Sequence, residues 1–337
     1  MAYAIRVHAY GGPEVLTWES VDIPQPGPGQ AKIRHTHIGL NFIDTYHRSG
    51  LYKQPQLPFV LGTEGAGEVL EVGEGVTDIA VGDRVAYASV IGAYAEERLI
   101  AAERLVKLPP GVDNQTAAAM MLQGMTVQYL LRRTFPVGPE TTMLLHAAAG
   151  GIGLIASQWA KHLGATIIGT AGSDEKAAMA KEAGCTHVIN SKTENFVERV
   201  KEITGGRGVD VVYDGVGKDT FPASLDCLKP RGMWVSFGNS SGPVPPFEIA
   251  ILAAKGSLFA TRPTLNHYVA TRADLLATAQ DLFDVVEQGH VKIAVNQTYA
   301  LKNTADAHRD LEARKTTGST VLLPDRVIRP TPARESS

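Results

Sequence analysis

The sequence predicts an α/β protein in two parts, a β-rich unit and a doubly wound parallel sheet of six strands. Two patterns carry this prediction. In the first hundred residues, turn signals rich in Gly and Pro separate short alternating runs, which is typical of compact, barrel-like β structure. From Thr141 onward, continuous apolar strand candidates alternate with helical stretches, which is typical of a parallel sheet covered by helices on both faces.

In the first part, strands are expected at 31–38, 68–72 and 83–87, each next to a glycine turn signal. Asp113 can cap a helix over 114–133. The β-rich part therefore ends where a long helix leads into the second part.

In the second part, the expected strands are 141–147, 165–170, 187–190, 209–214, 232–237 and 256–261. The first expected helix runs to 163, and the others cover 174–183, 193–204, 219–228 and 247–255. A helix over 272–287 then opens a return segment that ends in a strand at 319–323, so we expect the C-terminal segment to rejoin the first part. Residues 325–337 contain Pro and Arg without periodicity and are expected to form a loose tail.

Composition narrows the classes of function. The 337 residues suffice for two domains, and a hydrophobic fraction of 44% is too high for a disordered chain. A formal charge of -3 gives no cationic excess, so we expect no nucleic-acid partner. Two cysteines make no disulfide framework, which favours the cytoplasm. The N-terminus resembles a strand rather than a signal peptide, and the most apolar stretch, 144–156, is too short to span a bilayer, so we expect no membrane association.

The most informative motif lies within 144–154. It matches the dinucleotide-binding fingerprint at Ala148, Gly150 and Gly153, with Ala in the first glycine position. Such a site needs a tight turn, a backbone free of Cβ atoms beside the pyrophosphate, and helix N–H groups that bind phosphate charge. Because the motif follows a predicted strand and opens a predicted helix, it predicts dinucleotide binding. A glycine turn without a ligand is the alternative.

Several sequence blocks match one known family. These blocks are Asn41–Tyr46, Leu61–Gly67, Leu122–Thr126, Ala148–Gly153 with Gln158–Lys161, and Val235–Gly242. Over residues 1–324 the chain resembles the zeta-crystallin-like quinone oxidoreductases, a zinc-free branch of the medium-chain dehydrogenase/reductase superfamily. Within that branch it is most similar to the bacterial NADPH:quinone reductases.

The resemblance implies a GroES-like catalytic domain in residues 1–125 and 264–337, and a Rossmann-type NADPH-binding domain in 126–263, with the nicotinamide in the cleft between them. It implies hydride transfer from NADPH to a quinone without zinc. Reduction of an enone, enal or enoyl substrate is the nearest alternative. A crystallin-like or RNA-binding role on the same scaffold is an alternative of another class. The physiological acceptor, and the choice between one-electron and two-electron quinone reduction, stay open.

Zinc-dependent relatives hold their metal with a thiolate and a histidine, and neither is present at the matching positions. Asn41 stands in place of the thiolate, Thr63 replaces the histidine, and no cysteine precedes Cys185. His35 and His37 lie two apart on an expected strand and should share one face, but bare pairs of this kind are commonly surface or interface residues. We therefore expect no metal, and hydride delivery to an electrophilic acceptor does not require a Lewis acid for an alkoxide.

The resemblance also implies a catalytic set in the cleft, made of Asn41, Tyr46, Tyr52, Gln123 and Thr126. A tyrosine hydroxyl can hydrogen-bond to the cofactor or to a developing oxyanion. Ordinary aromatic packing is the alternative for Tyr46, and ordinary polar helix positions are the alternative for Gln123 and Thr126. Asp44 could equally order the loop, cap a helix or take part in catalysis.

The cofactor contacts implied by the resemblance follow the ends of the predicted strands. They are Asn41, Tyr46, Thr126, Ala149, Gly150, Gly151, Ile152, Gly153, Gly172, Ser173, Lys176, Ser191, Gly217, Phe237, Gly238, Asn239, Ser240, Thr261, Arg262, Pro263 and Arg314. Ligands bind at the carboxyl ends of parallel strands, which is where most of these positions fall.

The second predicted strand lacks the acidic residue that NAD-specific proteins place at its end to bind the ribose hydroxyls. Asp174 lies at about the expected interval from the glycine turn, but we place it at the start of the next helix, where a carboxylate suits the helix dipole. Ser173 and Lys176 are then expected to bind the 2′-phosphate of NADPH. Ser191 stands where relatives commonly have a tyrosine. We therefore predict a preference for NADPH over NADH that is weaker than in those relatives.

The last expected strand is short and apolar, and it leaves an unpaired sheet edge. Family members pair such edges across a two-fold axis, so we expect a homodimer through 256–261. Cys185 and Cys227 are expected to be buried small apolar residues.

Overall fold

The structure is a computed structural model that describes residues 2–325, and this part of the chain divides into two compact units. Unit 1 contains the described residues up to Leu122, the segment Thr271–Ala279 and the described residues from Val295 onward. Unit 2 contains Gln123–Ala270 and Gln280–Ala294. The domain limits predicted at 125/126 and 263/264 stay a prediction. Of the predicted tail, 326–337 lies outside the described residues.

Unit 2 is built on a parallel sheet of six strands whose order is β11-β10-β9-β12-β13-β14. The strands are β9 (Thr142–Leu145), β10 (Thr166–Ala171), β11 (His187–Asn190), β12 (Val209–Asp214), β13 (Leu228–Ser236) and β14 (Phe259–Thr261). Numbered from β9, this is the order 3-2-1-4-5-6 of the doubly wound dinucleotide fold. The predicted fold class is confirmed.

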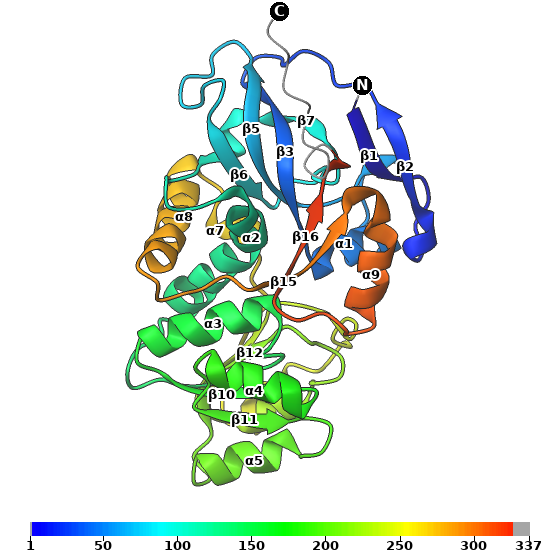
Figure 1. Cartoon of the computed structure of the whole chain (residues 1–337). Helices are drawn as coiled ribbons and strands as arrows, with labels where there is room; N and C mark the ends of the chain where they lie inside the picture. The colour runs from blue at the N-terminus through cyan, green and yellow to red at the C-terminus, as the bar shows by residue number, and fades with distance from the viewer. Residues whose placement is uncertain (1, 326–337) are drawn as a thin grey trace, which may run out of the picture. The chain divides into compact units, whose positions relative to one another are not determined.

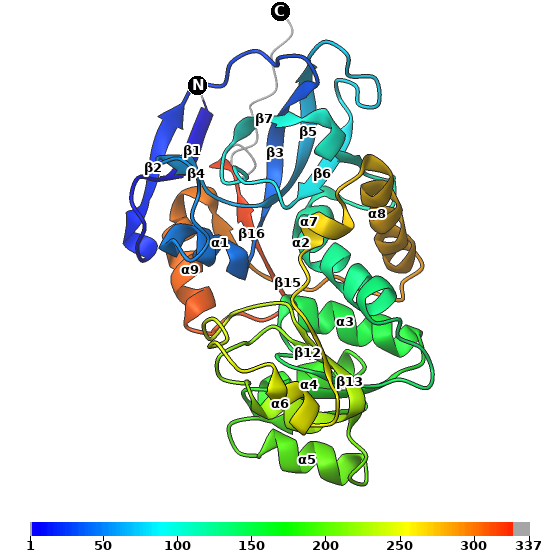
Figure 2. The same ribbon diagram turned by 180° about the vertical axis from the view of Figure 1, so that it is seen from behind.

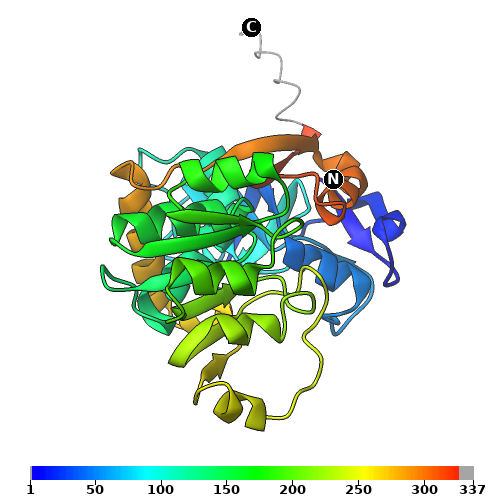
Figure 3. The same cartoon turned by 90° about the horizontal axis from the view of Figure 1, so that it is seen from below.

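Helices lie on both faces of this sheet, as Figure 3 shows. They are α3 (Gly151–His162), α4 (Asp174–Glu182), α5 (Phe196–Ile203) and α6 (Ala250–Ala254). Strand residues such as Leu144, Ile168 and Val212 are fully buried, because the covering helices exclude water from both faces. The helix predicted from Thr193 begins three residues later, because the Asn195 side chain caps it by accepting hydrogen bonds from two backbone N–H groups.

The helix predicted over 219–228 is wrong. The structure has a short 3₁₀ turn at Ala223–Cys227, and β13 begins at once with Leu228. Pro222 explains the difference, since it has no N–H to donate and disfavours helical geometry in the residue before it. The predicted strand at 256–261 is also shorter, because Gly256 and Ser257 both have positive φ angles that form a turn before β14.

Unit 1 contains two sheets (Figures 1 and 2). The larger follows the order β15-β16-β3-β5-β6-β8, with β7 also paired to β3. Its strands are β15 (Val295–Ala300), β16 (Ser319–Leu323), β3 (Gln30–Leu40), β5 (Glu64–Val72), β6 (Arg84–Ala88), β8 (Val106–Lys107) and β7 (Glu97–Ala101). The smaller sheet has β2 (Leu16–Val21), β1 (Ala2–Val7) and β4 (Phe59–Val60). Because β16 pairs antiparallel with β3, the predicted return of the C-terminal segment to the first part is confirmed.

The two histidines of β3 do not share one face as predicted. A register shift lies between His35 and His37, so the strand's alternation changes phase there. His35 is buried, with its ring nitrogens on the Ala95 carbonyl and the Tyr87 hydroxyl, whereas His37 is half-buried and Ile38 takes the next inward position.

The remaining helices are α1 (Phe42–Ser49), α2 (Asn114–Tyr129), α7 (Leu265–Tyr268), α8 (Arg272–Glu287) and α9 (Thr304–Glu312). The helix predicted over 114–133 is present as α2 followed by a π-helical turn, Leu130–Thr134. Among the described residues, no helix has the length and apolar character needed to cross a membrane.

Candidate active site

The glycine turn between β9 and α3 has the geometry of a phosphate cradle. Ala147 adopts a left-handed conformation with φ of 54°, and the Gly150 N–H donates to the Ala147 carbonyl at 3.0 Å. A Cβ at Gly153 would lie 2.4 Å from that carbonyl oxygen, so the helix approaches the turn more closely than any side chain allows. The first N–H groups of α3 have no acceptor inside the helix and carry its positive dipole end. These residues fit a dinucleotide pyrophosphate.

Gln123 lies directly against this turn. A Cβ at Gly151 would stand 2.1 Å from Gln123 Oε1, so the side chain of α2 and the first residue of α3 are in contact. Thr126 follows three residues later on α2, and both side chains are buried. The structure therefore brings Gln123 against the predicted position Gly151.

The ends of β10 and β11 form a second group of predicted residues. A Cβ at Gly172 would meet no atom within 4 Å, so space is open beside this turn. Ser173 caps α4 and accepts a hydrogen bond from the Lys176 N–H at 3.2 Å. The Ser191 hydroxyl donates to the Ala171 carbonyl at 3.1 Å, which ties the end of β11 to the end of β10.

The ends of β12 and β13 are joined by a buried carboxylate. Asp214 accepts hydrogen bonds from the backbone of Val216 and Gly217, from the hydroxyls of Thr220 and Ser224, and from Trp234 Nε1. These bonds fix the turn in which Gly217 has φ of 90°.

The predicted residues after β13 lie against that turn. A Cβ at Gly238 would lie 2.6 Å from the Gly215 carbonyl oxygen, and the Ser240 N–H donates to this carbonyl. Phe237 donates its N–H to the Asp214 carbonyl, and Asn239 lies in the same loop. The loops after β12 and β13 are thus packed and hydrogen-bonded to each other.

The last predicted cofactor positions are more exposed. Thr261 is the last residue of β14. Arg262 is exposed, and its guanidinium donates a hydrogen bond to the carbonyl of buried Pro263. Arg314 belongs to unit 1, where it follows α9 with a left-handed φ of 59°.

In unit 1, Asn41 is the centre of a buried polar group that we call the Asn41 cluster, made of Asn41, Asp44, Thr63, Glu64 and Tyr94. Asn41 Nδ2 donates to Glu64 Oε2 at 2.7 Å, and the Asn41 backbone N–H donates to Asp44 Oδ2 at 2.9 Å. Thr63 and Tyr94 donate their hydroxyls to Asp44 at 3.0 and 2.8 Å. Asn41 and Thr63, which stand where zinc-dependent relatives have their ligands, are therefore each hydrogen-bonded to a carboxyl group.

Burial dominates the electrostatics of this cluster. It raises the pKa of Glu64 to about 8, against the opposing effect of hydrogen bonds from the Leu122 N–H and Asn41. It raises the pKa of Asp44 to about 6, against three hydrogen bonds that favour the anion. At neutral pH, Glu64 is therefore mostly protonated and Asp44 mostly ionised.

A hydrogen-bond chain extends from Asp44 to the surface. Burial, assisted by the nearby Arg48 charge, lowers the pKa of His308 to about 3 and keeps it neutral. Arg48 donates to His308 Nδ1 at 2.9 Å, His308 Nε2 lies 3.2 Å from the Tyr94 hydroxyl, and Arg48 makes a bidentate pair with Glu312. This arrangement leaves the Tyr94 proton directed at Asp44.

Tyr46 and Tyr52, the two predicted tyrosines, lie together at the end of α1. Their rings meet edge to face with centroids 5.3 Å apart, and the Tyr52 N–H donates to the Tyr46 carbonyl at 3.0 Å. Both are half-buried. Among the described residues, no group of three or more His, Cys, Asp or Glu side chains is arranged to hold a metal ion.

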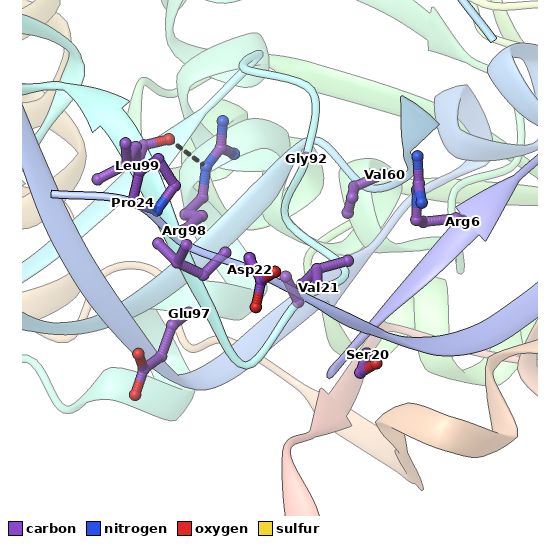
Figure 4. A pocket seen from close by; sticks show the side chains of 12 residues that line it. Arg6, Ser20, Val21, Asp22, Pro24, Val60, Gly92, Glu97, Arg98 and Leu99 are labelled. Carbon is purple, nitrogen blue, oxygen red and sulfur yellow. Dashed lines mark hydrogen bonds between the residues drawn. The ribbon is translucent and has the colours of Figure 1, made fainter. Parts of the chain in front are cut away.

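Unit 1 also has a hollow that contains none of the predicted residues (Figure 4). Arg6, Asp22, Val60 and Arg98 are among the residues that line it. The Arg98 guanidinium is used within the protein, since it donates to the carbonyls of residues 90, 91 and 99.

Sequence reasoning missed several polar residues that shape these sites. Asp214 and Asn190 are the last residues of apolar strands, and a polar residue at such an end is the signal that could have identified them. His146, directly after β9, bonds to Thr170 and Ser224, and burial lowers its pKa. Glu64 gave no signal of its own outside the matched block.

The strand order 3-2-1-4-5-6, with a glycine turn after its first strand, defines a dinucleotide-binding protein of the doubly wound class. Two family models match the chain: the alcohol dehydrogenase GroES-like domain over 27–110 and the zinc-binding dehydrogenase over 151–281.

The chain is 54% identical over 325 residues to a quinone oxidoreductase of Pseudomonas aeruginosa, covering 96% of this chain and 100% of that protein. It is 48% identical to a 2-haloacrylate reductase of a Burkholderia species, covering 96% and 99%. The solved structure of Escherichia coli quinone oxidoreductase complexed with NADPH matches with a TM-score of 0.94 at 50% identity, covering 96% and 100%. The chain belongs to the quinone oxidoreductase family of the medium-chain dehydrogenases and reductases, and it is an oxidoreductase.

Proposed function

We propose that the protein reduces quinones with hydride from NADPH. The observation that carries this proposal is the cradle between β9 and α3, where Gly150, Gly151 and Gly153 form a turn that fits a pyrophosphate. Family membership supports the choice of acceptor, since relatives at 50–54% identity are named quinone oxidoreductases. NADPH, when bound, supplies the hydride.

The chain's own residues bind, orient and exclude water. The N–H groups at the start of α3 would hold the pyrophosphate, and the residues after β10 would hold the adenosine ribose. The joined loops after β12 and β13 would contact the remaining part of the nucleotide. Asn41 and Tyr46 act on the acceptor, where a polar side chain can hydrogen-bond to the oxygen that gains charge. The bond from Asn41 Nδ2 to Glu64 fixes the orientation of the Asn41 amide before the acceptor binds.

The experiment is a panel of acceptors with NADPH, with products identified by mass spectrometry. We expect simple quinones to support NADPH oxidation and to be converted to the corresponding hydroquinones. No turnover with any quinone, while activated alkenes are reduced, would contradict it.

Reduction of an activated alkene is the second candidate. The relative named 2-haloacrylate reductase, at 48% identity over nearly the whole chain, favours it. A 2-haloacrylate carries an electron-poor double bond that accepts hydride at carbon. Saturated 2-haloacid among the products of the panel would support this candidate.

Cofactor preference is tested at Lys176, which lies in the first turn of α4 beside the capping Ser173. We propose that Lys176 binds the 2′-phosphate. Lys176→Ala should raise the KM for NADPH about ten- to a hundredfold, because one charged hydrogen bond is lost. The KM for NADH should change little. Equal increases for both cofactors would show that Lys176 does not recognise the phosphate.

We also propose a homodimer through the edge strand β14. Phe259 on this strand is 56% exposed, and Ile249 next to α6 is 76% exposed, so apolar side chains accompany an unpaired strand edge. Light scattering at micromolar concentration should give twice the chain mass, and a mass of 36.0 kDa would refute the dimer.

A cytoplasmic location is proposed because Cys185 and Cys227 are both free thiols.

A further inference from the structure

Asp174 presents a problem for an enzyme that uses NADPH. It is the first residue of α4, directly after the turn that follows β10, where the fold places the adenosine ribose. A free carboxylate here would accept hydrogen bonds from the two ribose hydroxyls of NADH, and it would repel a 2′-phosphate. Asp174 is exposed, so a bound nucleotide could reach its carboxylate.

The structure shows how this carboxylate is held. Asn190, the last residue of β11, donates from Nδ2 to Asp174 Oδ1 at 2.7 Å. Asn190 pairs with Ala171 in the register of β10 and β11, so the bond crosses from one strand end to the helix after its neighbour. The carboxylate is thus directed at the end of β11.

The orientation of the Asn190 amide is itself fixed. Asn190 Oδ1 accepts the Lys192 N–H at 3.1 Å, which leaves the NH₂ group for Asp174 and rules out the flipped amide. The Asn190 N–H donates to Glu194 Oε1 at 2.9 Å, and the side chain is 9% exposed. Because both ends of this buried amide are hydrogen-bonded, Asn190 holds the Asp174 carboxylate in one orientation.

We propose that Asn190 is a positioning residue for cofactor specificity. By holding Asp174 at the end of β11, it keeps the carboxylate from binding the ribose hydroxyls and from opposing the 2′-phosphate at Ser173 and Lys176. This inference rests on the proposed use of NADPH.

The test is a double-mutant cycle read by calorimetric binding of 2′,5′-ADP and 5′-AMP, which needs no acceptor and no turnover. Asn190→Ala should lower the preference for 2′,5′-ADP over 5′-AMP about tenfold, because the released carboxylate faces the phosphate. Asp174→Asn keeps an acceptor for Asn190 and should leave the preference within about threefold of the original protein. The double variant should recover most of the preference lost in Asn190→Ala.

Asn195→Ala is the matched control, because Asn195 lies in the same connection, caps α5 and has no bond to Asp174 among the described contacts. It should lower the melting temperature without changing the preference. A merely structural role for Asn190 would give no recovery in the double variant, and this result would overturn the proposal. A rise of about tenfold in Asp174→Asn alone would also overturn it, since Asp174 would then oppose the phosphate despite Asn190. If the original protein shows no preference for 2′,5′-ADP, the proposed cofactor fails instead.

Discussion

Unit 2 and unit 1 build their candidate sites in different ways. In unit 2, the site lies at the ends of neighbouring parallel strands and consists mostly of backbone, at Gly150, Gly153 and Gly217. In unit 1, the Asn41 cluster joins side chains from the start of α1, from residues 63 and 64, and from Tyr94. The first site has no room for a side chain at Gly153 or Gly217, whereas the second depends on charge and hydrogen bonds. The two should therefore respond to different substitutions.

The largest effect is expected at Gly153. In Gly153→Ala, the new Cβ would lie 2.4 Å from the Ala147 oxygen and 2.6 Å from the Ala148 carbonyl, and backbone atoms cannot move away cheaply. We expect at least a tenfold loss of affinity for 2′,5′-ADP and about 1–3 kcal/mol of destabilisation, measured by calorimetry and chemical unfolding. Gly138→Ala is the control in the same unit, since its Cβ would meet no atom within 4 Å. Equal behaviour of the two variants would contradict the close approach of α3 to the turn.

The second prediction concerns Asp44. Asp44→Asn replaces one acceptor oxygen by a donor, although three hydrogen bonds reach the carboxylate. We expect a loss of about 1–3 kcal/mol in the free energy of unfolding, because a buried donor loses its partner. Binding of 2′,5′-ADP should stay unchanged.

Asp78→Asn, at an exposed position, should change neither quantity. A loss of nucleotide affinity in Asp44→Asn that matches the loss of stability would contradict the separation of the two sites.

The third prediction is a dependence of stability on pH. Because the pKa of Glu64 is about 8 in the folded protein against an ordinary value of 4.5, the folded state binds more protons in that window, and stability falls as pH rises. The buried histidines, among them His35 and His308 with pKa values of about 3, act in the opposite sense up to about pH 7.5, because histidines of the unfolded chain still bind protons there. Asp44 acts in the same sense as Glu64, but mainly below about 6. From pH 7.5 to 8.5 the free energy of unfolding should therefore fall by about 0.5–1 kcal/mol.

Unfolding curves of Glu64→Gln across this window check the assignment. The variant cannot titrate, so its slope should be flatter than that of the original protein. Glu68→Gln, on the exposed side of β5, should keep the original slope. Identical slopes in all three proteins would show that Glu64 is not the group that titrates.

The smallest expected effect is that of metal removal. Since Asn41 and Thr63 offer an amide and a hydroxyl, each bonded to a carboxyl group, exhaustive chelation should leave the rate of NADPH oxidation unchanged. Elemental analysis of the purified protein accompanies the assay. Stoichiometric zinc, with activity that is lost on its removal and restored with it, would contradict this prediction.

The site predicted in unit 2 rests largely on local information in the sequence. A strand, a glycine turn and a helix follow one another within a short stretch, and parallel strands bring their carboxyl ends to one edge. The exception was the segment around Pro222, where the alternating pattern suggested a helix that proline disfavours.

The Asn41 cluster could not be derived in the same way. Asn41 and Tyr46 were singled out by resemblance, but the pairing of Asn41 with Glu64 joins residues 23 positions apart, and Tyr94 is 50 positions from Asp44. No periodicity records which buried polar groups satisfy each other. The bond between Asn190 and Asp174 could not be predicted for the same reason, although the spacing of Asp174 from the glycine turn marks it as a residue near the ribose site.

We propose that unit 2 binds the nucleotide mainly through the loops at its strand ends, whereas Asn41 acts on the acceptor. The most direct test is Asn41→Ala, with circular dichroism to confirm folding, measured for kcat with a quinone and for the Kd of 2′,5′-ADP on the same preparation. We expect kcat to fall about tenfold or more and the Kd to stay unchanged. An unchanged kcat, or a Kd that rises in step with the loss of kcat, would contradict it.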